Sequence, residues 1–378
     1  MSIPAIEVFA NRARIYARRR RAEKLRHHAM ARPFSKGSAE KLLLVTQPER
    51  IPQSQIFPFH HYADDLKALY GAEVREADTW DVLAGKPTVA SGASVVAFQT
   101  PFDMPDDDLF RLIARLRDAN PGARIVCLDW FAPTDLRNAA RLNPLIDVYV
   151  KKHVLRDRSL YGQPTRGDTN LTDAFNRRFE IDEPQQCFDI PPGFFDKLVV
   201  GPSFVTAPGI LPVLSGRLPR LEGRSCDVHA RFAVGGTPWY QAMRAEAEMA
   251  LTQISDITVF KGEGVPLARF MVEMQNTKIG FSPFGYGEVC WRDYEAIMAG
   301  AVLLKPDMSH IETAPDIFVP WETYVPVKWD LSDFEETVRT LVTDASLRHK
   351  IARQAFETLH DWVTSDQFAR AMAPLFSK

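Results

Sequence analysis

The sequence predicts an α/β protein with two domains, each built on a parallel sheet covered by helices. Two observations carry this prediction. Short apolar runs alternate with helical segments along most of the chain, and one segment rich in proline and glycine interrupts the alternation. The length agrees, because 378 residues exceed what a single hydrophobic core usually organises.

The N-terminal segment, residues 1–37, is strongly basic. Residues 1–36 carry a net charge of +8, which leaves −10 on the rest of the chain. Residues 6–28 are rich in helix formers and carry a partial apolar stripe beside a dense arginine face. This pattern predicts a basic helix that binds anionic lipid headgroups; the alternatives are a helix packed on its own acidic chain and a disordered arm.

The first domain is expected over residues 38–206. Its expected strands are 42–46, 94–98, 124–130 and, more weakly, 146–153, with helices over 60–71 and 106–122. Residues 47–62 are polar and rich in proline, and we expect them to form a loop facing the second domain. Residues 155–205 show no clear pattern.

The second domain follows a linker over residues 207–223, which contains three prolines and three glycines. We place this domain at 224–345 and further helices at 346–378. Its expected strands are 226–232, 256–262, 278–285 and 301–306, and its expected helices are 237–254, 266–277 and 288–300. Two such Rossmann-like domains form a central cleft, with the carboxyl ends of their strands facing it.

The composition argues against several classes of protein. Lys and Arg number 46 against 48 Asp and Glu, and this net charge of −2 gives no general attraction to nucleic acid. The four cysteines, Cys127, Cys187, Cys226 and Cys290, form no C-x-x-C pair, so neither a zinc knuckle nor a disulfide framework is expected. No segment has the roughly 20 apolar residues of a membrane span, and no secretory signal is evident. We expect a cytoplasmic protein, at most peripheral to the inner face of the membrane.

Residues 281–307 contain the most informative motif. Gly285 and Gly287 allow a tight turn and a close backbone approach to a ligand, and the next helix would direct its positive dipole end at that turn. Glu288, Arg292 and Glu295 have the spacing i, i+4 and i+7, which predicts one shared helix face. An arginine between two carboxylates suits a diphosphate and sugar hydroxyls, whereas the alternative is a surface charge ladder.

This segment resembles the nucleotide-sugar-binding region of GT-B-fold glycosyltransferases, in the group 1-like C-terminal domain. The matching string is R-D-Y-E-A-I-M-A-G-A-V-L-L, residues 292–304. The resemblance implies transfer of a sugar from a nucleotide-diphosphate sugar to a hydroxyl of a glycan or lipid-linked saccharide, as in the synthesis of bacterial surface polysaccharide or glycolipid. It implies that Glu295 holds the donor's ribose or sugar and that the terminal helices cross back to the first domain. Glu288 lies seven residues before Glu295, whereas many retaining members have a spacing of eight.

Further bases are expected at the strand ends of the second domain. Arg231 and Lys261 each precede glycines, and basic groups at the carboxyl ends of neighbouring strands converge on a cleft, where they can stabilise a leaving diphosphate. The alternative is two solvated surface bases. The expected donor-binding residues are Arg231, Gly235, Gly236, Lys261, Gly285, Gly287, Arg292 and Glu295.

Metal and cofactor sites are not expected. The acids of 106–108 open a predicted helix, where carboxylates favour the dipole, so a D-x-D metal motif there is the weaker interpretation. GT-B enzymes typically use basic side chains in place of a metal, and the nucleotide sugar is a substrate rather than a cofactor.

The candidates for the catalytic base are His60, His61 and Asp129, and Glu288 is a further catalytic candidate that could instead hold donor hydroxyls. Imidazole titrates near neutral pH and can take a proton from an acceptor hydroxyl, and Asp129 ends a predicted strand. The residues alone do not choose among them. Two other functions fit the same architecture, a nucleotide-sugar epimerase and a non-catalytic nucleotide-sugar-binding module.

Overall fold

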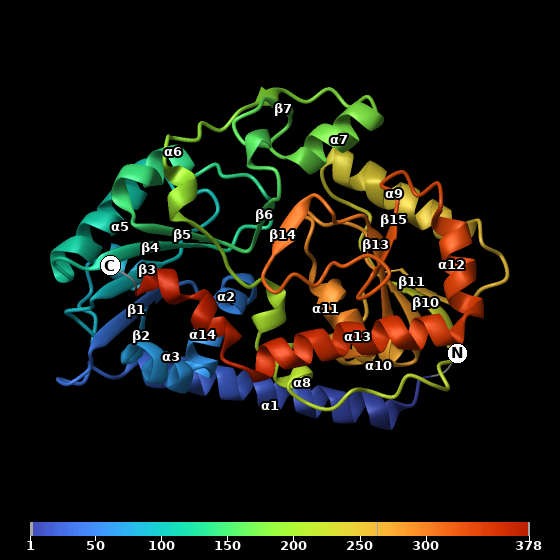
Figure 1. Cartoon of the computed structure of the whole chain (residues 1–378), viewed down its shortest axis with the longest axis horizontal. Helices are drawn as coiled ribbons and strands as arrows, with labels where there is room; N and C mark the ends of the chain where they lie inside the picture. The colour runs from blue at the N-terminus through green and yellow to red at the C-terminus, as the bar shows by residue number, and fades with distance from the viewer. Residues whose placement is uncertain (1–2, 263, 377–378) are drawn as a thin grey trace.

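The computed structural model describes residues 3–262 and 264–376 and contains two parallel sheets, one in each half of the molecule (Figure 1). The first sheet has six strands in the order β2-β1-β3-β4-β5-β9, and the second has five in the order β11-β10-β12-β13-β15. All neighbouring strands in both sheets are parallel. The predicted class, α/β with two Rossmann-like domains, is confirmed.

The first sheet contains β1 (Glu40–Thr46), β2 (Ala72–Asp78), β3 (Val95–Phe98), β4 (Arg124–Asp129), β5 (Val148–Lys151) and β9 (Leu198–Val200). Its helices are α2 (Arg50–His61), α3 (Ala63–Tyr70), α4 (Thr79–Leu83), α5 (Asp106–Ala119) and α6 (Ala139–Leu142). The central strands are almost wholly buried, because helices cover both faces of the sheet.

The second sheet contains β10 (Cys226–Ala230), β11 (Val259–Lys261), β12 (Thr277–Phe281), β13 (Val302–Pro306) and β15 (Val325–Val327). Its helices are α9 (Pro238–Thr252), α10 (Leu267–Gln275), α11 (Trp291–Met298) and α12 (Phe334–Thr343). The motif region 281–307 therefore spans the end of β12, a turn, α11 and β13, as expected from its glycines and apolar runs.

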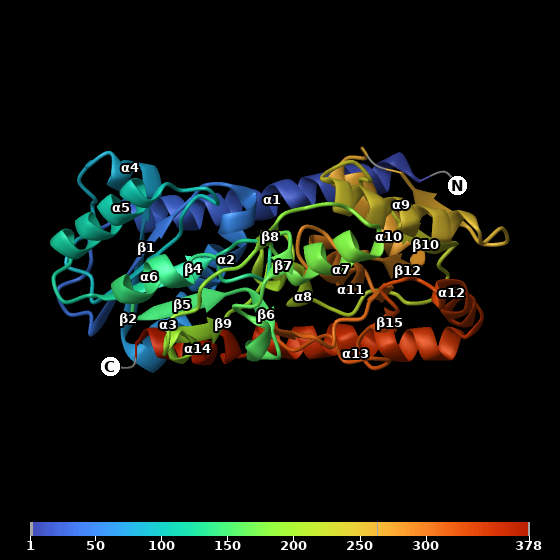
Figure 2. The ribbon, with the colours of Figure 1, turned by 90° about the horizontal axis from the view of Figure 1, so that it is seen from above.

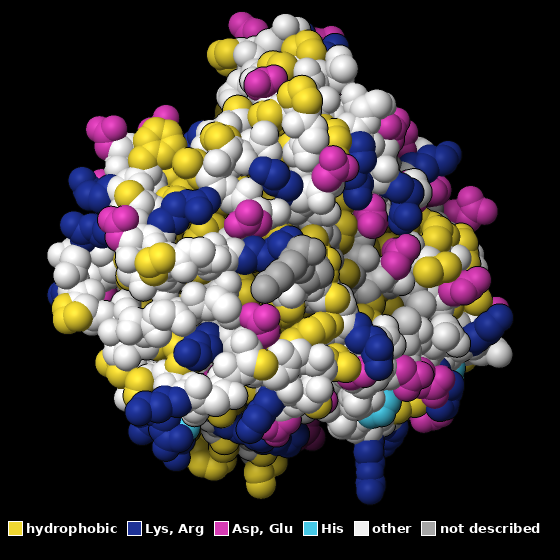
Figure 3. Space-filling model, turned by 60° about the vertical axis from the view of Figure 1, so that its left-hand side comes forward, with side chains coloured by type: hydrophobic (Ala, Val, Ile, Leu, Met, Phe, Trp, Pro, Cys, Tyr) yellow, Lys and Arg dark blue, Asp and Glu magenta, His cyan; other side chains and the backbone are white. Residues whose placement is uncertain are grey.

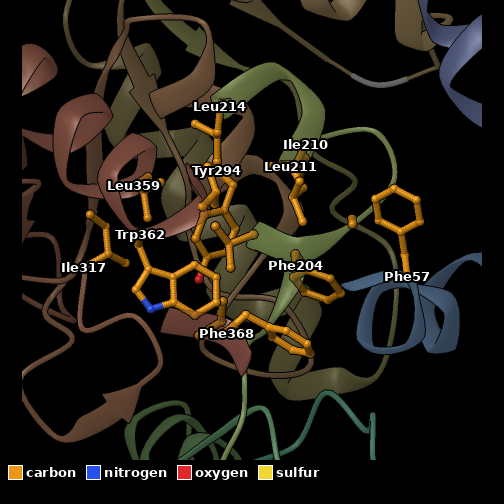
Figure 4. Close-up of a cluster of buried hydrophobic side chains, with 14 of the residues drawn as sticks. Phe57, Phe204, Ile210, Leu211, Leu214, Tyr294, Ile317, Leu359, Trp362 and Phe368 are labelled. Atoms are coloured by element: carbon orange, nitrogen blue, oxygen red, sulfur yellow. The ribbon is translucent and has the colours of Figure 1, made fainter. Parts of the chain in front are cut away.

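The chain between the sheets and the C-terminal helices join the two domains. Helix α8 (Leu211–Leu214) lies in the segment 207–223, and α13 (Ala345–Thr364) and α14 (Gln367–Ala371) return to the first domain. There the Tyr62 hydroxyl donates a hydrogen bond of 2.7 Å to the carbonyl of Val363. Figure 4 shows side chains of α2, α8, α11, α13 and α14 in one hydrophobic cluster, so the apolar core is continuous between the domains.

Helix α1 (Ala5–Met30) lies along both domains (Figures 1 and 2). It packs against α10 of the second domain and against α2 and β2 of the first. The Arg26 guanidinium donates a hydrogen bond of 2.7 Å to the buried Glu76 of β2. The predicted basic helix is therefore present and packs on its own chain. Among the described residues, no helix is long and apolar enough to cross a membrane.

Two segments differ from the sequence prediction or were not assigned by it. Residues 50–61 form helix α2, not a loop, because the apolar residues Ile56, Phe57 and Phe59 are buried against the sheet and outweigh the prolines. Strand β6 (His153–Leu155) begins at the end of the expected strand 146–153, and the unassigned region contains β7 (Thr165–Arg166), α7 (Asn170–Arg178) and β8 (Gln185–Gln186). Strand β6 pairs with β14 (Ile311–Thr313), and α7 packs on α9, so this region connects the domains a second time.

Charges of both signs are mixed on the surface. On the face shown in Figure 3, Lys and Arg side chains lie among Asp and Glu side chains, and hydrophobic side chains are scattered. This face therefore has no large patch of a single charge sign.

Candidate functional site

The loops at the carboxyl ends of the two sheets touch one another. A Cβ atom at Gly287, in the turn after β12, would lie 1.8 Å from the carbonyl oxygen of Ala132, in the loop after β4. In the same turn the Gly285 amide donates a hydrogen bond of 3.0 Å to the carbonyl of Gly287. Gly287 therefore allows a close approach, as predicted, but the group that approaches is the other domain.

Glu288 lies fully buried between the domains. Its carboxylate accepts hydrogen bonds from the Thr134 hydroxyl and, at 2.8 Å, from the Asn170 amide. The Nε2 atoms of His153 and His310 lie 3.3 and 3.6 Å from its oxygens. Burial acts to raise the pKa of Glu288, but its interactions with the two imidazoles outweigh burial, so the pKa is well below its ordinary value. The carboxylate is charged and joins both domains.

The predicted common helix face for Glu288, Arg292 and Glu295 is wrong. Helix α11 begins at Trp291, so Glu288 precedes it and follows the turn towards the first domain. Arg292 instead donates a hydrogen bond of 2.9 Å to the carbonyl of Arg231. Glu295 lines a cavity with Trp291. The spacing rule fails because it assumes that the helix begins three residues earlier.

The cavity has a volume of about 420 Å³ and lies between α1, α2, α10, α11 and the start of the linker segment. Glu295 is only 7% exposed, and burial raises its pKa although nearby Arg50 acts to lower it. Arg50 Nη2 lies 3.9 Å from Glu295 Oε1, and the Arg50 guanidinium lies over the Trp291 ring at 4.2 Å. The volume is in the range of small-molecule sites, about 300–1,000 Å³.

Two guanidinium groups that do not line the cavity pack against aromatic rings of the second domain. Arg244, in α9, is buried, and its guanidinium lies 5.2 and 4.9 Å from the ring centres of Phe232 and Tyr240. The Arg292 guanidinium lies 5.8 Å from the centre of the same Phe232 ring. Burial and then the charge of Arg292 lower the pKa of Arg244 to about 10. Within the described part of the chain, no carboxylate lies within 4.0 Å of either guanidinium. The sequence prediction missed Arg244, although an arginine within the apolar stripe of a helix is a usable signal.

The other predicted donor residues are dispersed. Arg231 forms an ion pair with the fully buried Glu273 and donates a hydrogen bond of 2.7 Å to the carbonyl of Lys261, whose own side chain is exposed. Gly236 packs against the rings of Tyr240 and Tyr286, whereas Gly235 has open space around its Cα. The donor roles of Arg231, Lys261, Gly235 and Gly236 stay predictions, and the charge of Arg231 is already balanced.

Three candidates for the base lie within the first domain. His60 Nε2 is 2.6 Å from Glu76, in a network that includes Arg26. Burial and then the charge of Arg21 lower the pKa of His61. The sequence predicted a helix that begins at His60, but in the structure both histidines lie at the end of α2.

Asp129 is buried in a network of its own. Its carboxylate accepts hydrogen bonds of 2.8 Å from Lys151, 2.6 Å from the Tyr149 hydroxyl and 2.8 Å from the Phe131 amide. Of the four candidates, Glu288 is the one placed between the domains.

Lys152 is a buried amine that the sequence prediction did not single out. Its Nζ atom has no hydrogen-bond partner among the described residues and lies 4.2 Å from the ring centre of Phe204, which stacks on Trp291. Burial lowers its pKa to about 7, although Asp129 acts to raise it. Burial therefore disfavours the charged form of this amine.

This pKa predicts a stability that rises with pH. From pH 7 to pH 10 the unfolded chain holds the Lys152 proton and the folded chain does not, so the free energy of unfolding should increase by up to about 1.4 kcal/mol per pH unit. Urea unfolding at pH 7, 8 and 9 measures this slope. Lys152→Met should flatten it, whereas Lys350→Met, at an exposed position, should not. Equal slopes in all three proteins would contradict the assignment.

The described residues contain no group of three or more His, Cys, Asp or Glu side chains arranged to hold a metal ion. Asp106, Asp107 and Asp108 lie in the first turn of α5, as predicted. There Asp106 pairs with Arg141 and Asp108 with Arg111.

Comparisons with known proteins concern the fold alone. No family model matches the chain, and no curated protein matches it. The solved structure of TarM is 10% identical over 76% of this chain, with a TM-score of 0.46, and the chain spans about half of TarM, 55% of its length. An alpha-glucosyltransferase in complex with UDP and a 13-mer DNA containing a HMU base is 8% identical over 90% of this chain and 100% of that one, with a TM-score of 0.48. The GtfA/B complex has a TM-score of 0.39 at 9% identity, over 75% of this chain and 57% of that one. All three TM-scores are below 0.5, so the α/β architecture with two Rossmann-like domains rests on the two parallel sheets of this chain itself.

Proposed function

We propose that the protein is a glycosyltransferase that moves a sugar from a nucleotide-diphosphate sugar to a hydroxyl of a glycan or lipid-linked saccharide. The observation that carries this proposal is the position of Glu295. The acid expected to hold the donor is buried, yet it lines a cavity of about 420 Å³ at the junction of the two domains. A ligand there would contact both domains and lie out of bulk water, which limits hydrolysis of the donor.

The chemistry requires positive charge where the bond breaks. The acceptor oxygen forms a bond to the anomeric carbon, and the bond between that carbon and the diphosphate oxygen breaks, so the nucleoside diphosphate leaves with the electron pair. Arg50 lines the cavity beside Glu295, where its guanidinium can stabilise this leaving group. We propose that this arginine charge acts in place of a metal ion.

The acceptor hydroxyl must lose a proton. Glu288 is the candidate base that lies between the domains, and His310 beside it has a side chain that is 23% exposed. A charged, buried carboxylate can orient an imidazole that solvent or substrate reaches. We therefore propose that His310 contacts the acceptor and takes its proton, and that Glu288 orients the His310 imidazole.

The outer face of α1 fits an anionic membrane surface. Ile6, Phe9 and Tyr16 are 77, 73 and 60% exposed there, and Arg12 and Arg20 on the same helix are exposed as well. Apolar side chains between arginines are typical of helices that lie in a lipid headgroup region. We propose a protein of the cytoplasm that meets lipid-linked acceptors at the inner membrane face and does not act on nucleic acid.

Incubation of the purified protein with a panel of nucleotide sugars, with and without EDTA, tests the function. We expect slow release of free sugar and nucleoside diphosphate, unaffected by EDTA, and faster release when extracted glycolipid acceptor is added. An epimerised sugar would show an epimerase, and binding without turnover would show a binding module.

Vesicle cosedimentation tests the membrane role of α1. We expect the protein to cosediment with anionic but not with neutral vesicles; equal cosedimentation with both would contradict this role.

A further inference from the structure

Helix α1 supplies charged and polar side chains to the lining of the interdomain cavity. Asn11, Arg14, Ile15, Arg18 and Ala22 recur at helical spacing, so they lie on one face of the helix, and all of them line the cavity. Five arginines line the cavity against two glutamates. The helix therefore presents a basic face to the cavity, on which Arg18 is half-buried and Arg14 and Arg19 are exposed.

Most of this positive charge is not balanced by the protein. Arg26 is paired with Glu76, and Arg50 is 3.9 Å from Glu295. No carboxylate lies within 4.0 Å of Arg14, Arg18 or Arg19 in the part of the chain that the structure describes. Like charges brought together in partly desolvated space repel, unless an anion lies between them.

Burial is the main cause of the lowered pKa values of two of these groups, and like charge adds to it. Burial and then the charge of Arg14 lower the pKa of Arg18. Burial lowers the pKa of Arg50 as well; Glu295 acts to raise it, and Arg19 acts to lower it further.

A polar group on the same helix face also lacks a partner. Asn11 is buried, and its side-chain nitrogen makes no hydrogen bond with the described residues. A buried amide donor without a partner costs free energy, so a ligand that accepts its hydrogen bond would be favoured.

Most of the remaining lining is apolar, although Gln53 and Gln275 also line the cavity. The large apolar part includes Ile15 and Ala22 of α1, Ile210 and Val213 beside α8, Leu267 and Met271 of α10, and Trp291 and Met298 of α11. The cavity therefore offers guanidinium groups on one side and apolar or flat surfaces on the other. This combination fits an organic molecule with a multiply charged anionic group.

We infer that this cavity binds an organic diphosphate, whose charge is held by Arg14, Arg18 and Arg19 of α1 together with Arg50. Guanidinium groups bind phosphate oxygens through pairs of N–H donors, and several of them can share one diphosphate. The inference deepens the proposed function and rests on it for the organic part, which is the nucleoside of a donor or the prenyl chain of a lipid-linked acceptor. Helix α1 is then part of the substrate site as well as a surface helix.

Calorimetric titration of the full chain tests the inference. The probes are UDP, GDP, ADP, farnesyl diphosphate and inorganic pyrophosphate, and the variants are Arg18→Ala and Arg20→Ala. Arg20 lies on the same helix but does not line the cavity, and it is weakly paired with Glu23 at 3.9 Å. We expect at least one organic diphosphate to bind the parent protein, with Kd raised about tenfold or more by Arg18→Ala and unchanged by Arg20→Ala. A nucleotide that binds identifies a donor, and farnesyl diphosphate that binds identifies a lipid-linked ligand.

Two further variants, Arg18→Lys and Arg14→Ala, keep the test valid if Arg18→Ala misfolds, which circular dichroism would detect. Both should weaken binding, and Arg18→Lys should retain more of it than Arg18→Ala. Equal affinities of Arg18→Ala and Arg20→Ala, or no binding of any diphosphate by the parent, would overturn the inference. Failure of the proposed function looks different: binding that depends on Arg18 without turnover of any nucleotide sugar would refute the transferase and leave the diphosphate site intact.

Discussion

Asp129→Asn is expected to lower the free energy of unfolding by about 3–5 kcal/mol. The Asp129 carboxylate is buried and accepts a hydrogen bond of 2.8 Å from the equally buried Lys151, and the unpartnered amine of Lys152 follows in the sequence. Removing the negative charge leaves a buried ammonium group without its counterion. Urea unfolding at neutral pH measures the loss.

Asp107→Asn is the matched control, because Asp107 is an exposed acid in the first turn of α5. It should cost at most about 0.5 kcal/mol. If Asp129→Asn cost no more than this control and abolished turnover instead, Asp129 would be the catalytic base and not a structural acid.

Gly287→Ala is expected to destabilise the protein by about 3 kcal/mol, at the upper end of the usual effect of overpacking. The new methyl group would lie 1.8 Å from the Ala132 carbonyl oxygen, a backbone atom that cannot rotate away. The loops of the two domains must then separate, which also disturbs the hydrogen bond between Thr134 and Glu288.

Gly235→Ala is the control for this change, since a Cβ atom at Gly235 would meet no atom within 4 Å. Its free energy of unfolding should stay within about 0.5 kcal/mol of the parent value. Equal stability of the two variants would show that the domains do not touch at Gly287 in solution.

The fold was predictable because its central strands are continuous apolar runs. Such runs predict strands that are buried on both faces, as at residues 42–46, 94–98 and 226–232. Strand β2 was not predictable in the same way. It lies at the edge of the sheet and reads AEVREAD, and its Glu76 is buried because Arg26, His60 and Thr46 surround it. Those partners come from distant parts of the chain.

The candidate site was predictable only in its location. The glycine turn and the acids after β12 do lie at the domain junction, but the directions of Glu288, Arg292 and Glu295 depend on where α11 begins. That start is set by the Cys290 and Asp293 cap, in which the Asp293 carboxylate also accepts hydrogen bonds from Ser282 and, at 3.1 Å, from Lys305. Such contacts are tertiary, so helical spacing alone could not reveal them.

The same reason explains the residues that were missed. His153 and His310 approach Glu288 because β6 and β14 pair between the domains, and the weak strand pattern of 146–153 gives no sign of that pairing. Helix α1 was predicted as a helix from composition, yet its cavity face depends on packing against α10. Pairings between segments far apart in the chain are not encoded in local periodicity.

The proposed donor site is the cavity beside Glu295. A crystal structure of the protein with a bound nucleoside diphosphate, chosen as the one that binds most tightly, tests this site. We expect the nucleoside in the cavity between α1, α10 and α11, with a ribose hydroxyl within hydrogen-bond distance of Glu295. A nucleotide bound elsewhere on the molecule, with this cavity unchanged, would contradict it.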